Sequence, residues 1–240
     1  KSIYTFIVQS NYFYYNYTIN NKNIMKTEFE KYATGHLKVP SLDLYNYKNS
    51  MTPYILEERE MRATQMDIFS RLMMDRILWC AGEVNDRMST IVQAQLMFLN
   101  SVEKKDITIH IDSPGGSVKS GLSIVDVMEY IDCDIRTINT GMAASMGSIL
   151  LGAGTKGKRS SLRFSKTMLH QSSGGMGGNI QDARISMDEW EKTNKILFDL
   201  LGKFTGKTAK KVMKDATRDL WLDADEALNY GIIDEIIGKK

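Results

Sequence analysis

The spacing of apolar residues after position 54 predicts alternating strands and helices. Compact or alternating apolar runs at 76–80, 106–111 and 135–138 are typical of buried strands. The segments between them carry apolar residues at helical spacing, namely Met88, Val92, Leu96 and Leu99, then Val118, Leu122, Val125 and Met128. This alternation predicts an α/β fold with a mainly parallel sheet covered by helices.

Further elements flank this repeat. A short amphipathic helix is expected at 66–73, and Asn85 is placed to cap the helix that begins next to it. After the repeat the pattern predicts, in chain order, a short strand ending at 168–170, a loose glycine-rich turn at 172–178, a long helix from about 180 to 204, short helices at 208–214 and 225–231, and a terminal strand at 232–237. We expect the long helix to project from the body, because it is long for a chain of this size.

The first 50 residues have a different character. Residues 1–24 carry five Asn and five Tyr, lack acidic residues and glycine, and do not begin with Met. They also lack the apolar core and small-residue cleavage site of a signal peptide, and the arginines of a transit peptide. We therefore predict that 1–50 is a largely disordered, propeptide-like extension with Met25 as the natural start, and that 51–240 forms a single domain.

Composition narrows the class of protein. An apolar content of 42% and a charged content of 25% over 240 residues are ordinary for a globular protein. The net charge of +2 gives no general attraction to nucleic acid or membranes, and no apolar run approaches the roughly 20 residues of a membrane span. Cys80 and Cys133 show no ligand spacing. We expect a cytoplasmic protein without a metal site or a disulfide framework.

Candidate chemistry centres on Ser145. Small residues at 141–148 lead from a predicted strand into an apolar, helix-like run, so Ser145 is expected at a strand-to-helix turn. A serine hydroxyl is a weak nucleophile and needs a base within hydrogen-bond reach. The chain has three histidines, His36, His110 and His170. His170 is the candidate base, because it lies at a predicted strand end beside the glycine-rich turn.

An oxyanion hole and an orienting carboxylate would complete such a site. Gly116, at a second strand-to-helix turn, and Met146, next to the serine, offer backbone N–H groups. In parallel α/β sheets such turns meet beyond the carboxyl ends of the strands. Spacing leaves the carboxylate open among Asp215, Asp219, Asp223 and Asp225. Ala143 stands where the G-x-S-x-G elbow has its first glycine, so these residues indicate a serine hydrolase without that motif.

Several of these residues lie in motifs that resemble one known family, the proteolytic subunits of Clp protease. The matching stretches, which occur in order and at fitting spacings, are 66–72, 112–116, 141–147, 157–159, 168–171, 217–219 and 224–231. The resemblance implies that Ser145, His170 and Asp219 form a catalytic triad. It also implies that the N–H groups of Gly116 and Met146 form the oxyanion hole.

The resemblance extends over roughly 52–238 and implies an architecture and partners as well. Members have a crotonase-like α/β fold and form two stacked seven-subunit rings with the active sites inside. An AAA+ Clp unfoldase docks on this barrel and uses ATP to feed in unfolded polypeptides, so this chain is expected to be a serine endopeptidase of protein quality control without a cofactor of its own. The resemblance assigns the long helix to the family's handle, residues near 52–65 to an axial entrance loop, and Ser172, Ser173, Gly174 and Gly175 to the strand that binds substrate.

Departures from the family pattern and two alternatives accompany this interpretation. The first 50 residues exceed the family pattern, and Ser172 stands where many members have proline, which we expect to loosen the substrate strand. One alternative is a crotonase-type acyl-CoA enzyme, in which Ser145 would only pack. The other is a catalytically inert ring subunit that supports active partners. The presence of all three triad residue types argues against an inert subunit.

Overall fold

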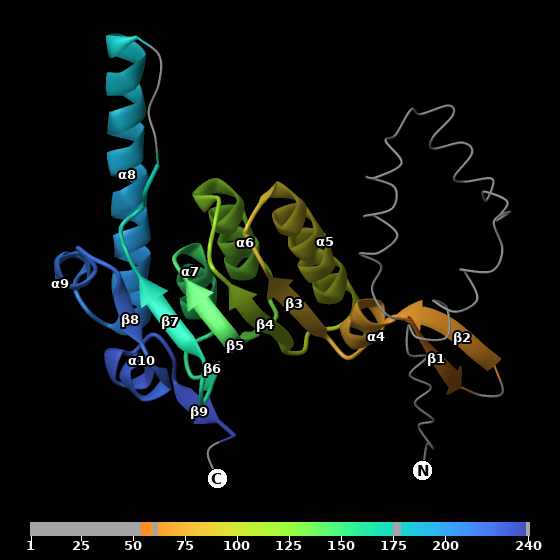
Figure 1. The fold of residues 1–240 in the computed structure, drawn as a ribbon. Helices are drawn as coiled ribbons and strands as arrows, with labels where there is room; N and C mark the ends of the chain where they lie inside the picture. Colours follow the sequence, from red (N-terminus) through yellow and green to blue (C-terminus); the bar gives the residue numbers. More distant parts are fainter. Residues whose placement is uncertain (1–53, 60–61, 175–178, 239–240) are drawn as a thin grey trace, which may run out of the picture. The chain divides into compact units, whose positions relative to one another are not determined.

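Figure 1 shows the computed structural model, which describes residues 54–59, 62–174 and 179–238. The extension predicted at 1–50 lies outside the described residues, so its boundary with a single domain at 51–240 stays a prediction. Between Arg71 and Leu72 the chain divides into two compact units.

The unit that contains residues up to 71 is a hairpin followed by the start of a helix. Its elements are the antiparallel strands β1 (Tyr54–Arg59) and β2 (Arg62–Asp67), and helix α4 (Ile68–Met74). The prediction of a helix over 66–73 was wrong at its start, because these first two residues complete β2. The carboxylate of Asp67 accepts hydrogen bonds from the N–H groups of Phe69 and Ser70 at 3.1 and 3.0 Å, which caps α4 at this point.

The second unit is built on a seven-stranded sheet. Its strands are β3 (Ile77–Ala81), β4 (Ile107–Ser113), β5 (Ile135–Ala144), β6 (Arg159–Leu162), β7 (Lys166–Leu169), β8 (Leu220–Leu222) and β9 (Glu235–Ile237). They run in the order β3-β4-β5-β6-β9, while β7 pairs with β5, and β8 pairs with β7. Every pair is parallel except β7–β8, which confirms the predicted, mainly parallel α/β sheet.

The helices of this unit follow the predicted pattern closely. They are α5 (Asp86–Val102), α6 (Val118–Tyr130), α7 (Met146–Gly152), α8 (Ile180–Thr205), α9 (Ala209–Asp215) and α10 (Ala224–Tyr230). The cap expected at the start of α5 is confirmed, since the Asn85 side chain accepts a hydrogen bond from Met88 N–H at 2.9 Å. Val92, Leu96 and Leu99 then bury one face of α5 in the core.

Helix α8 projects from the sheet, as its length predicted (Figure 1). Its 26 residues begin at the cap of Asn179, whose side chain accepts hydrogen bonds from two backbone N–H groups, and end at left-handed Gly206. Burial is confined to its C-terminal part, where Leu197, Phe198 and Leu201 enter the core. The first turns of α8 therefore lie beyond the hydrophobic core of this unit.

Two strand segments differ from the prediction. β5 continues past the predicted 135–138 through Ala144, where the buried residues are small or polar: Ala143 and Ala144 are buried, and buried Asn139 donates to Lys166 O at 2.9 Å. β6 has no apolar alternation, and the pattern predicted no strand at that point. It begins at Arg159, a fully buried cation whose partners come from a later part of the chain.

Arg159 joins β6 to the turn before β9 and to the end of α8. Its guanidinium donates to the Asp234 carboxylate at 2.8 and 2.6 Å, and to the carbonyl oxygens of Phe204 and Gly231 at 2.8 and 3.0 Å. Only 1% of its side chain is exposed. Burial alone would raise the pKa of Asp234, but hydrogen bonds from Arg159 and Lys156 and the charge of Arg159 hold that pKa well below its ordinary value.

Replacing Arg159 by methionine is expected to lower the free energy of unfolding by about 3 kcal/mol or more, because the change leaves a largely buried carboxylate without its cation. Urea denaturation measures the change. Arg136→Met is the matched control, since Arg136 is 43% exposed and lies 3.8 Å from Glu235, so the expected loss is about 1 kcal/mol or less. Equal losses in the two variants would contradict the structural role of Arg159.

The pH dependence of stability is expected to change in an Asp234→Asn variant. A carboxylate whose pKa is lowered by folding stabilises the protein fully above its ordinary pKa of about 3.9, and this contribution is lost as pH falls toward the folded-state pKa. The gap in unfolding free energy between wild type and Asp234→Asn should therefore be largest near neutral pH and shrink below about pH 4. A gap that stays constant down to pH 2.5, measured by denaturation at stepwise pH, would refute this expectation.

Candidate active site

Ser145 occupies the sharp turn between β5 and α7 that the sequence predicted. Its φ of 53° and ψ of −121° put a non-glycine residue in a sparsely populated conformation. The turn is held by a hydrogen bond from Ser145 N–H to Met168 O at 2.9 Å, and by bonds from Ser148 to the Ser145 carbonyl. A strained serine between a strand and a helix is also the geometry of the nucleophile elbow, although its glycine motif is absent here.

The predicted glycine turn after β4 packs directly against this serine. A Cβ at Gly115 would lie 2.7 Å from Ser145 Cβ and 2.8 Å from Ala144 O. A Cβ at Gly116 would collide with Val84 O. Both glycines have positive φ, 95° and 146°, so this loop needs glycine for conformation as well as for space.

His170 lies within hydrogen-bond distance of the serine. It is the first residue after β7, and its Nε2 is 2.7 Å from Ser145 Oγ. Its other ring nitrogen, Nδ1, is 3.4 Å from Asp219 Oδ1. This second separation exceeds an ordinary N–H···O distance, and the Asp219 side chain is 60% exposed.

Among the carboxylates that spacing left open, Asp219 is the one that lies against the imidazole. Asp215 instead bonds with Lys211 and Tyr230, contacts that lower its pKa. Asp223 accepts from Glu226 N–H and caps α10, while Asp225 belongs to the first turn of that helix. The antiparallel pairing of β7 and β8, which sets Leu169 opposite Leu220, brings the neighbouring positions 170 and 219 together.

The two backbone amides assigned to the oxyanion hole adjoin the serine turn, since Met146 follows Ser145 and Gly116 follows Gly115, which packs against that turn. Met146 is the first residue of α7, so its N–H has no partner within that helix. Gly116 bridges to Val84, but the hydrogen bonds of this bridge use the Gly115 carbonyl and the Ser117 N–H. The Gly116 amide therefore takes no part in the bridge.

The other histidine and the cysteines of the described chain lie elsewhere. His110 stacks on Trp79 with ring centroids 4.7 Å apart, and burial lowers the pKa of its imidazole. Cys80 is buried and its pKa is raised to about 12, which keeps the thiol protonated; Cys133 is also a free, buried thiol. His36 lies outside the described residues. Within the described chain, the hydroxyl that meets a histidine ring in a hydrogen bond is that of Ser145.

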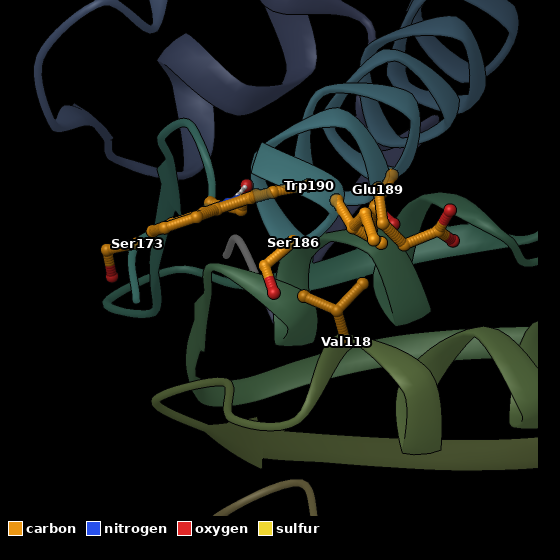
Figure 2. A pocket seen from close by; sticks show the side chains of 8 residues that line it. Val118, Ser173, Ser186, Glu189 and Trp190 are labelled. Carbon is orange, nitrogen blue, oxygen red and sulfur yellow. Dashed lines mark hydrogen bonds between the residues drawn. The ribbon is translucent and has the colours of Figure 1, made fainter. Parts of the chain in front are cut away.

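A hollow of about 490 Å³ lies beside the segment that follows His170 (Figure 2). Its lining comes from three places in the chain: Val118 at the start of α6; Ser172 and Ser173 after His170; and Ile185, Ser186, Glu189, Trp190 and Thr193 on α8. Ser172, Ser173 and Gly174 are described and lie outside any strand, whereas Gly175 lies outside the described residues. The hollow thus adjoins the start of α6, which follows the Gly115–Gly116 turn, and the segment that follows His170.

The sequence did not indicate that α8 contributes to this hollow. Ile185, Glu189 and Thr193 recur at four-residue spacing and so share one helix face. That spacing is visible in the sequence, but it mixes apolar, acidic and hydroxyl side chains. No single property therefore distinguishes it from an exposed helix surface.

The described parts of the chain bear on two further kinds of site. They contain no cluster of three or more His, Cys, Asp or Glu side chains arranged to hold a metal ion. Within the same residues, every helix is too short or too polar to cross a membrane.

Comparison with known proteins identifies relatives over most of the chain. Residues 58–240 match the Clp protease family. The ATP-dependent Clp protease proteolytic subunit of Porphyromonas gingivalis is 48% identical over 217 residues, covering 88% of this chain and 98% of that protein. The proteins of that name from Bacteroides fragilis and Streptococcus mutans are 48% and 46% identical over 89% and 78% of this chain, and over 99% and 97% of their own lengths.

A serine at a strained turn with an imidazole at hydrogen-bond distance is the arrangement of serine hydrolases. The chain belongs to the Clp protease family, and it is a serine peptidase with that family's crotonase-like fold. Membership of this family favours the peptidase interpretation over the alternative of a crotonase-type acyl-CoA enzyme.

The alignment with the Porphyromonas gingivalis protein covers 88% of this chain, which is more residues than 52–238 contains. Part of the segment before residue 52 is therefore aligned as well.

Gly115→Ala is expected to slow the reaction of Ser145 with a fluorophosphonate about tenfold or more, because the new methyl group displaces the serine turn. Intact mass against time measures the rate. Gly157→Ala is the matched control: its φ of 88° resembles the 95° of Gly115, but nothing lies within 4 Å of the added Cβ. A comparable slowing in both variants would show that backbone strain alone, without contact at the serine, is responsible.

Proposed function

We propose that Ser145, His170 and Asp219 are the catalytic residues of a serine endopeptidase that cleaves unfolded polypeptides. The observation that carries this proposal is the 2.7 Å separation of Ser145 Oγ and His170 Nε2, in a chain of the Clp protease family. The strained backbone of Ser145 supports it as well, because such conformations concentrate at functional sites.

The geometry suggests a role for each side chain. His170 Nε2 accepts the proton of Ser145 Oγ as the oxygen attacks the peptide carbonyl, and then gives that proton to the leaving amine. For this, Nδ1 must carry the other ring proton, which points toward Asp219 Oδ1. The carboxylate thereby orients the ring and stabilises the imidazolium, and the 3.4 Å separation would shorten when substrate binds.

The backbone supplies the stabilisation of the tetrahedral intermediate. The N–H groups of Gly116 and Met146 are the proposed oxyanion donors. In support, the Gly116 amide takes no part in the bridge to Val84, and the Met146 amide has no helical partner. The close fit of Gly115 against the serine turn keeps the two donors near each other.

Substrate would bind as an extended chain along the segment that follows His170. Ser172, Ser173, Gly174 and Gly175 are the proposed contacts, with one substrate side chain entering the hollow of Figure 2. The backbone of such a segment offers hydrogen bonds that do not depend on the substrate's sequence. That property suits an enzyme that must accept many unfolded chains.

The proposal extends to the assembly. We infer two stacked rings of seven subunits, fed by an AAA+ Clp unfoldase that uses ATP, in cytoplasmic protein quality control; this chain would need no cofactor itself. Ile91, Phe98 and Val102 lie on one face of α5 and expose 46%, 54% and 63% of their surfaces. A neighbouring subunit that covers this apolar face would stabilise the assembly.

Ser145→Ala is expected to abolish peptide hydrolysis while the assembly survives, because it removes only the nucleophilic oxygen. Treatment of wild type with a fluorophosphonate, followed by peptide mapping, should place a single adduct on Ser145. Native mass spectrometry tests the assembly. Ser123→Ala, which removes a hydroxyl that bonds to Lys119 O within α6 and to no other described residue, should keep full activity.

Full turnover by Ser145→Ala would refute the mechanism. If wild type neither hydrolyses peptide nor forms the adduct, the experiment is repeated with a candidate AAA+ unfoldase. Labelling that appears only with the unfoldase would indicate a resting triad that its partner aligns. Its continued absence would argue for the inert ring subunit.

A further inference from the structure

Two residues after the proposed catalytic histidine, Ser172 is hydrogen-bonded to helix α8. Trp190 Nε1 donates to Ser172 Oγ at 2.6 Å. Ser172 in turn donates to Asn194 Oδ1 from both its backbone N–H and its hydroxyl, each at 3.2 Å. Trp190 and Asn194 are four residues apart and therefore share one helix face, so a single face of α8 holds one serine.

The same tryptophan also packs on the backbone beyond that serine. A Cβ at Gly174 would lie 3.1 Å from the Trp190 ring, so the ring lies over the glycine. Figure 2 shows Trp190 extending from α8 toward the segment that carries Ser173. From the sequence we expected Ser172 to loosen this segment. Its hydrogen bonds instead tie the segment to α8.

The position of this contact matters because the sheet ends just before it. β7 ends at Leu169, which is fully buried, and His170 is the first residue beyond the strand. On the far side, the Gln171 side chain approaches Thr217 O at a long 3.4 Å. Among residues 171–174, the shortest hydrogen bond is therefore the one that Ser172 accepts from Trp190, at 2.6 Å, and the bonds from Ser172 to Asn194 are 3.2 Å long.

We propose that Ser172 is a positioning residue. Trp190 and Asn194 hold it against α8, and this keeps the backbone of His170 where its imidazole reaches Ser145. This inference rests on the proposed function, because it assigns His170 the role of base. The imidazole is fixed from one side by β7 and from the other by this contact with α8. A displacement of α8 would therefore change the distance between the base and the serine.

Four variants isolate the hydroxyl from the packing. Ser172→Ala removes the acceptor of Trp190 and the hydroxyl donor to Asn194 but keeps the backbone N–H donor, whereas Ser172→Thr keeps an oxygen at the same position. Trp190→Phe keeps an aromatic ring over Gly174 and removes the N–H donor. The fourth variant combines Ser172→Ala with Trp190→Phe, and Ser123→Ala is the control.

The measurements are kcat and KM for a fluorogenic peptide, the rate of fluorophosphonate labelling, and amide hydrogen exchange of residues 170–174. We expect Ser172→Ala to lower kcat and labelling about tenfold with KM little changed, because the base is misplaced while the backbone groups proposed to bind substrate are still present. Exchange at 170–174 should accelerate. Ser172→Thr should restore kcat, and Trp190→Phe should add nothing in the Ser172→Ala background.

Several results would overturn the proposal. A raised KM with unchanged kcat in Ser172→Ala would make Ser172 a substrate contact only. If Ser172→Thr does not restore a lowered kcat, the Ser172 hydroxyl does not position His170. The same conclusion follows if the losses in kcat of Ser172→Ala and Trp190→Phe add up in the double variant. If wild type itself were inactive and unlabelled, the proposed function would fail first; faster exchange in Ser172→Ala would then reveal a merely structural tether, and the positioning role would be rejected.

Discussion

The serine turn keeps its conformation because elements from distant parts of the sequence leave it no alternative. The Ser145 amide is bound by the Met168 carbonyl on β7, and Gly115 fills the space beside its Cβ. β7 therefore does two things at once: it anchors the turn that carries the hydroxyl, and two residues later it presents His170. Because one strand sets both groups, their separation depends on the sheet and not on either loop alone.

The parts of the fold that could be predicted are those where burial alone selects the residues. β4 buries every second side chain, Ile107, Ile109 and Ile111, and such alternation is readable from the sequence. β6 could not be predicted, because its first residue is a buried cation. Arg159 is compatible with the core only through Asp234 and two carbonyl groups far along the chain, and no local pattern records those partners.

The candidate site likewise has residues whose positions the sequence predicts and residues whose positions it does not. Ser145 and Gly116 follow strands, so their meeting beyond the carboxyl ends of a parallel sheet could be anticipated. Spacing could not select Asp219, because its place beside His170 follows from the register of the antiparallel pair β7–β8; family resemblance supplied that choice. Trp190 lies within the helix predicted at 180–204, but nothing in a periodic pattern marks the one donor on its ring.

The position of Arg159 in the chain has a consequence for biosynthesis. Ribosomes make proteins from the N-terminus, so β6 emerges well before the residues that neutralise its cation. Phe204, 45 residues later, offers the first acceptor, and Gly231 and Asp234 follow 72 and 75 residues after Arg159. Until then, burying the guanidinium would leave its charge uncompensated. The nascent sheet must therefore stay open at β6 until these partners have been made, and the burial of Arg159 is a step that follows the synthesis of Asp234.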